Sequence, residues 1–103
     1  MKKMLFLVLL TFASLVSYAI PNGCYYSGRS NSPRKHCEIL ISGDSFNCLN
    51  REGEVIARWT IVSDSDGRLT LKSEYGATAY ASWYTTDDGE VRIEFNYKTY
   101  RSM

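Results

Sequence analysis

The chain has 103 residues, of which 12 are basic and 11 acidic, giving a formal net charge of +1. This length suits one small domain, and the balanced charge leaves no basic excess that would hold nucleic acid or an anionic membrane by electrostatic attraction. The three cysteines, Cys24, Cys37 and Cys48, suit one disulfide in an oxidising compartment.

The first residues have the organisation of a secretory signal peptide. Two lysines precede an apolar run over residues 4–16, and Ser17-Tyr18-Ala19 then places small residues at the two positions that signal peptidase inspects. The pattern predicts a signal peptide over residues 1–19, cleaved before Ile20, and a periplasmic or secreted β domain over residues 20–103. The apolar run is shorter than the ~20 residues of a spanning helix, so we expect no membrane span after cleavage.

Alternating apolar and polar residues indicate about seven short β-strands in the mature part. The runs cover residues 23–27, 36–42, 45–50, 54–62, 68–74, 78–84 and 90–97. The last run is the clearest, because its four odd-numbered positions from Val91 to Tyr97 are apolar and the residues between them are polar or charged. No amphipathic helix is evident. The prediction is an all-β fold, a small antiparallel meander closed as a barrel or folded as a sandwich.

The lengths of the turns decide which side chains share a face of the sheet. Ile39 and Phe46 meet on one face only if the turn at Gly43-Asp44 has an even number of residues. The same parity brings Cys37 and Cys48 to one face, close enough to bridge.

Two later turns require the opposite parity. Ile61 and Leu71 share a face only if the loop over residues 64–67 is odd, so we expect three or five residues with Gly67 in the left-handed region. We expect the same odd parity at the turn over residues 86–89. The odd-numbered residues 79, 81 and 83 of the preceding strand then face the core, and residues 80, 82 and 84 face outward.

One intramolecular disulfide is predicted, with Cys37 as its shared member, because both neighbouring strands can present a cysteine to it. A bridge to Cys24 would close the polar loop over residues 28–35, and a bridge to Cys48 would cross-link a hairpin, so both pairings are open. A bridge between Cys24 and Cys48 is less favoured, because a meander separates the first strand from the third.

No grouping typical of catalysis, cofactor binding or metal binding stands out. The Asp-Gly turns at Gly67 and Gly89 are similar to calcium loops, but the positions that need carboxylates hold other residues. His36 and Cys37 are neighbours in a strand and point to opposite faces, which suits neither a nucleophilic pair nor a zinc site. We therefore predict a protein that is not an enzyme and uses no cofactor or metal.

The mature chain is rich in aromatic residues. Tyrosine and tryptophan provide rigid contact area with a polar tip, which suits binding surfaces as well as cores. The expected strand parity places Trp83 in the core and turns Tyr80 and Tyr84 outward. Together with Tyr75 and Arg58, these two tyrosines form a predicted recognition face.

Two short stretches resemble motifs of known barrel families. Gly23-x-Tyr25 resembles the opening Gly-x-Trp of lipocalins, with tyrosine in the place of tryptophan, on a chain that is short for eight full strands. Residues 76–80 are similar to the Ser-Gly-Ala-x-Tyr motif of periplasmic lysozyme inhibitors without reproducing it. Neither resemblance assigns the chain to a family.

The leading functional hypothesis is a non-catalytic binding or interaction module of the bacterial envelope or secreted fraction. Its partner would be a protein, a glycan or a small molecule, and the sequence does not specify which. The alternative is an inhibitor of a secreted hydrolase, of the lysozyme- or protease-inhibitor kind. It would act through the loop over residues 30–35, with Arg34 and Lys35 as contact residues.

Overall fold

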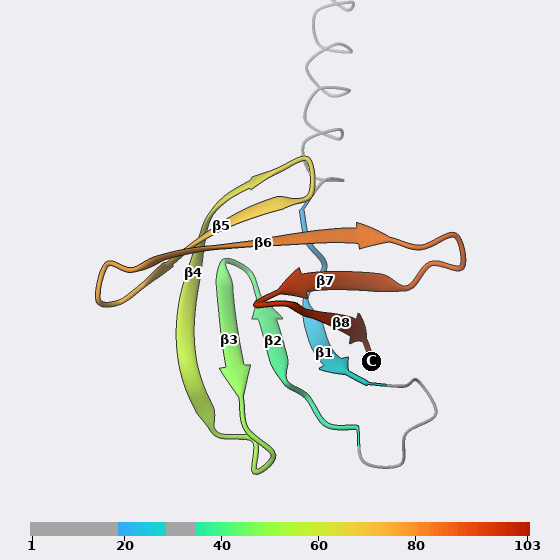
Figure 1. The fold of residues 1–103 in the computed structure, drawn as a ribbon, viewed down its shortest axis with the longest axis horizontal. Helices are drawn as coiled ribbons and strands as arrows, with labels where there is room; N and C mark the ends of the chain where they lie inside the picture. The colour runs from blue at the N-terminus through green and yellow to red at the C-terminus, as the bar shows by residue number, and fades with distance from the viewer. Residues whose placement is uncertain (1–18, 29–34) are drawn as a thin grey trace, which may run out of the picture.

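The computed structural model describes residues 19–28 and 35–103, so the predicted signal peptide lies outside it except for Ala19. Eight antiparallel strands form a closed barrel in which each strand pairs with the next along the chain, and β8 pairs with β1 (Figure 1). The strands are β1 (Gly23–Ser27), β2 (Ile39–Ser42), β3 (Ser45–Leu49), β4 (Val55–Ser65), β5 (Arg68–Ser73), β6 (Thr78–Thr85), β7 (Val91–Phe95) and β8 (Lys98–Ser102). No helix in the described ranges is long and apolar enough to span a membrane. The all-β meander and its barrel form are confirmed.

The strand predicted over residues 90–97 is two strands, which raises the count from about seven to eight. β7 ends at Phe95, which pairs with Lys98 at the start of β8. Between them Asn96 and Tyr97 have φ angles of 55° and 66°, as a two-residue type I′ hairpin turn requires. Tyr97 is fully exposed, so its apolar character continued the strand pattern by coincidence. The extra strand supplies the edge that closes the barrel against β1.

The β2–β3 hairpin has the predicted even parity. Its turn contains the two residues Gly43 and Asp44, with Ser42 opposite Ser45. Ile41 then lies opposite Phe46, and both side chains are buried.

The predicted odd loop between β4 and β5 is wrong. The turn has two residues, Asp66 and Gly67, with φ angles of 55° and 80°, so only the left-handed Gly67 is as expected. A β-bulge between Ile61 and Ser63 supplies the odd residue within β4 instead. Ile61 pairs with Leu71 before the bulge, and Asp64 pairs with Leu69 after it. The bulge therefore places Asp64 on the strand face that carries Ile61.

The β6–β7 connection has the odd parity that the sequence predicts. Trp83 pairs with Ile93, which is fully buried, whereas Tyr80 and Tyr84 are exposed on the outer side of β6. Tyr84 lies opposite Arg92.

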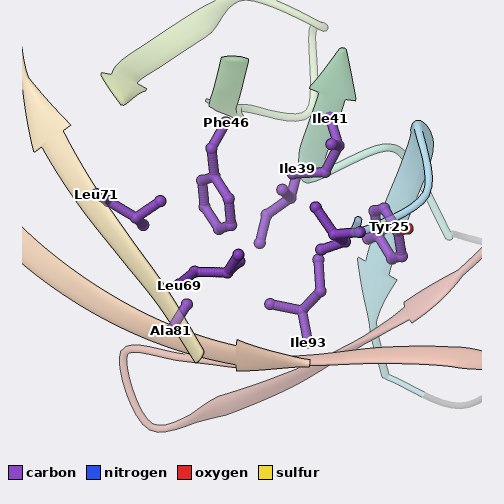
Figure 2. Close-up of a cluster of buried hydrophobic side chains, with 9 residues drawn as sticks. Tyr25, Ile39, Ile41, Phe46, Leu69, Leu71, Ala81 and Ile93 are labelled. Atoms are coloured by element: carbon purple, nitrogen blue, oxygen red, sulfur yellow. The ribbon is translucent and has the colours of Figure 1, made fainter. Parts of the chain in front are cut away.

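The interior of the barrel is filled by side chains, as Figure 2 shows. Seven large residues are at most 1% exposed: Tyr25, Ile39, Ile41, Phe46, Leu69, Leu71 and Ile93. Phe95 packs edge-on against Phe46, with ring centroids 5.2 Å apart. Eight strands enclose a space just wide enough for such packing, and each large apolar residue buried there stabilises the fold by roughly 1.5–3 kcal/mol.

Candidate binding surface

The four residues predicted as one recognition face lie on the outside of the barrel but not in one place. Tyr80 and Tyr84 are on β6, four residues and thus roughly 13 Å apart along the strand. Arg58 on β4 and Tyr75 in the β5–β6 turn line a different depression. The surface around Tyr80 is therefore separate from the surface around Arg58 and Tyr75.

The aromatic groove is a depression beside β6 at the β7–β8 turn. It is lined by Tyr80, Ala81, Ser82, Glu94, Phe95, Asn96, Tyr97, Lys98 and Thr99. Tyr80 is 73% exposed and Tyr97 is fully exposed. Tyr80 pairs with Thr70 of β5, and Tyr97 lies in the two-residue turn between β7 and β8.

The hydroxyl depression lies on the other side of Tyr80. It is lined by Ser63, Ser65, Asp66, Arg68, Leu69, Thr70, Tyr80 and Ala81. Thr70 on β5 pairs directly with Tyr80. Tyr80 therefore forms a shared wall of the two depressions, and a ligand that covers both would have this ring at its centre.

Both depressions carry mixed charge. Glu94 and Lys98 line the aromatic groove, and Asp66 and Arg68 line the hydroxyl depression. With serine, threonine and asparagine side chains between them, the surface offers hydrogen-bond donors and acceptors rather than one dominant charge. This arrangement suits a polar ligand with an aromatic or apolar portion.

Tyr84 is less available than Tyr80. It is 42% exposed and lies beside Arg92, whose Nε donates a 2.8 Å hydrogen bond to Oε1 of Glu90. Hydrogen bonds with Glu90, and then with Tyr84, raise the pKa of the Arg92 guanidinium. Tyr84 thus has a partner within the barrel wall.

The Arg58–Tyr75 depression is lined by Val55, Ile56, Ala57, Arg58, Trp59, Ser73, Glu74 and Tyr75. Ile56 and Tyr75 are largely exposed there. The depression is similar in character to the aromatic groove and provides matched comparison residues.

The disulfide joins Cys24 to Cys37, with Cα atoms 5.2 Å apart, so the prediction that Cys37 is the shared member is confirmed. Cys48 is free and half-buried, and burial raises the pKa of its thiol, which lowers its reactivity.

Of the two predicted inhibitory residues, Arg34 lies outside the described residues. Lys35 is exposed, and its Nζ lies 5.2 Å from the centre of the Tyr26 ring.

The acidic turns that were compared with calcium loops have structural roles. Asp88 accepts a hydrogen bond from Thr86, and this bond, followed by the backbone of Glu90, lowers the pKa of its carboxyl group. Asp66 forms the β4–β5 turn with Gly67. Across residues 19–28 and 35–103, no three His, Cys, Asp or Glu side chains gather in a way that could hold a metal ion.

Tyr97 is fully exposed in the groove, although its position in the alternating pattern predicted that it faces the core. The asparagine before it was the available signal, because asparagine tolerates the left-handed conformation that hairpin turns need.

The two stretches compared with family motifs lie in β1 and at the β5–β6 turn leading into β6. Comparison with family models, with curated proteins and with solved structures finds no match to this chain.

Proposed function

We propose that this chain is an exported, non-catalytic binding module that holds its partner on the outside of the barrel, across Tyr80. The observation that carries the proposal is the position of Tyr80, which is 73% exposed and lines both the aromatic groove and the hydroxyl depression. The filled interior supports an outer site, because the space where larger barrels hold small ligands is occupied by Phe46, Ile39 and their neighbours.

The partner that this surface fits is a protein or a glycan rather than a small apolar molecule. Tyrosine rings stack on sugars and pack against side chains at little conformational cost, and the flanking hydroxyls and mixed charges supply hydrogen bonds. A partner that spans both depressions would enclose Tyr80, and central enclosed tyrosines often dominate binding energy.

The proposal is tested with the mature protein immobilised and exposed to envelope extracts of the source organism, and in parallel by co-sedimentation with purified peptidoglycan. For any partner identified, Tyr80→Ala and Tyr97→Ala are expected to weaken binding about tenfold or more each. The double variant Tyr75→Ala/Arg58→Ala removes two exposed side chains from the other depression and should bind normally. Unchanged affinity of the Tyr80→Ala variant would contradict the proposed site.

A second candidate is an inhibitor of a secreted hydrolase, favoured by the position of the disulfide. Cys24 and Cys37 lie on either side of the segment that carries Arg34 and Lys35 in the sequence, and Cys24 belongs to β1 of the barrel. A disulfide across a binding segment suits inhibition, because a cross-link between the ends of a segment reduces the entropy that is lost on binding. Panels of lysozymes and serine proteases test this candidate. An inhibitor would lose potency in Arg34→Ala/Lys35→Ala and keep it in Tyr80→Ala, and turnover by the protein itself would contradict both functions.

A further inference from the structure

Ile20 is the residue that becomes the N-terminus if the chain is cleaved where its sequence predicts. Its side chain is only 6% exposed and packs in the hydrophobic core. Its backbone nitrogen donates a 3.0 Å hydrogen bond to Oδ2 of Asp64. The nitrogen on which cleavage would create a positive charge therefore already contacts a carboxylate.

The carboxylate of Asp64 is held in place by a second donor. Nε1 of Trp83 donates a 3.0 Å hydrogen bond to Oδ1, so each carboxylate oxygen has its own partner. Asp64 reaches this position because the bulge after Ile61 reverses the alternation of β4. Bulges that re-aim a single side chain commonly mark specific sites.

The segment before β1 is fixed by contacts that do not involve Asp64. The hydroxyl of Tyr25 donates a 2.7 Å hydrogen bond to the carbonyl of Pro21, and the amide of Gly43 donates a 2.9 Å bond to Oδ1 of Asn22. Figure 1 shows this segment entering β1 beside the β4–β5 turn. Ile20 is thus positioned at Asp64 by independent anchors.

We propose that Asp64 is a binding site for the α-ammonium group of Ile20, so that removal of the signal peptide adds an ion pair that locks this end of the barrel. The inference rests on the proposed export. A signal peptidase adds water across the Ala19–Ile20 peptide bond, Ala19 leaves as a carboxylate, and the Ile20 nitrogen takes up a proton to become an ammonium. Before cleavage the same nitrogen is an uncharged amide donor.

The added charge strengthens an existing contact rather than creating a new one. Hydrogen bonds between charged partners are stronger than those with a neutral donor, and this site is partly buried, so solvent screens it less than a surface pair. The chain therefore gains this part of its stability only after processing.

A thermodynamic cycle tests the lock. Chains beginning at Ile20 are prepared by chemical ligation with a free or an acetylated α-amino group, each with Asp64 and with Asp64→Asn. Acetylation removes the charge and leaves one Ile20 N–H on an amide nitrogen, so the acetylated chain reproduces the donor that is present before cleavage. With Asp64, acetylation is expected to raise the unfolding equilibrium constant about tenfold, which corresponds to about 1.4 kcal/mol. In the Asp64→Asn pair the change should be less than twofold, and equal changes in both pairs would overturn the proposal.

A second measurement applies if Asp64→Asn fails to fold. In the folded chain with a free amino group, NMR titration should find the pKa of the Ile20 α-amino group above its usual range of about 7.7–8.0, because the carboxylate favours the charged form. A value within or below that range would also overturn the lock.

The two proposals fail in distinguishable ways. Intact-mass measurement of protein from the source organism should show a mature N-terminus at Ile20. A chain that retains Met1 would contradict export and leave the cycle in synthetic chains unaffected. A confirmed Ile20 terminus without coupling to Asp64 would contradict only the lock.

Discussion

At the scale of single residues, Gly67 is the position where the barrel least tolerates a side chain. Its φ is +80°, and a Cβ there would lie 2.6 Å from the carbonyl oxygen of Trp83. Gly76 has a similar φ of +86° with no atom near its Cβ position. We expect Gly76→Ala to cost roughly 1–2 kcal/mol from backbone strain alone, and Gly67→Ala to cost more because β6 must also move. Denaturant unfolding measures both, and equal losses would show that the close approach to Trp83 is unimportant.

At the scale of elements, the β7–β8 hairpin has a residue in its turn that is both strained in its backbone and exposed in its side chain. Tyr97 is fully exposed in the left-handed region, which costs a non-glycine residue about 1–2 kcal/mol. Tyr97→Gly creates the preferred Asn-Gly turn, so it should stabilise the barrel by about 1 kcal/mol while weakening binding in the aromatic groove. Tyr97→Ala should weaken binding equally without the gain, because alanine keeps the strained backbone. A stabilised Tyr97→Gly variant with full affinity would mean that the ring has no role in recognition.

The registers of two hairpins differ in how far the sequence predicts them. The β2–β3 register followed from parity, because its two-residue turn leaves the alternation of Ile41 and Phe46 intact. The β4–β5 register did not, because parity requires one extra residue but cannot say whether it lies in the turn or in the strand. Val62 is as apolar as Ile61, so nothing in the pattern marked the bulge, and the contact of Asp64 with Trp83 was unpredictable for that reason.

The sequence could not show that the four residues of the predicted recognition face divide between two depressions. Strand parity correctly placed Tyr80 outside, but alternation fixes only the side of a sheet on which a residue lies. Which outward residues are neighbours depends on their positions along and across the strands, and Tyr75 in the β5–β6 turn lines a different depression from Tyr80 on β6.

At the scale of the whole molecule, the core is small, and a covalent link contributes a substantial part of its stability. The Cys24–Cys37 bridge spans 13 residues of sequence, and closing a loop of this length stabilises a fold by about 3 kcal/mol through the unfolded state. Replacing both cysteines by serine should therefore lower the unfolding free energy by roughly 2–4 kcal/mol, whereas Cys48→Ser should have a smaller effect because Cys48 is only half-buried.

Thiol titration of the denatured, unreduced chain should find one reactive group. In the native barrel that group should react more slowly, since burial raises its pKa and reduces the thiolate present near pH 8. Three reactive thiols in protein recovered from the envelope would contradict both the bridge and an oxidising location.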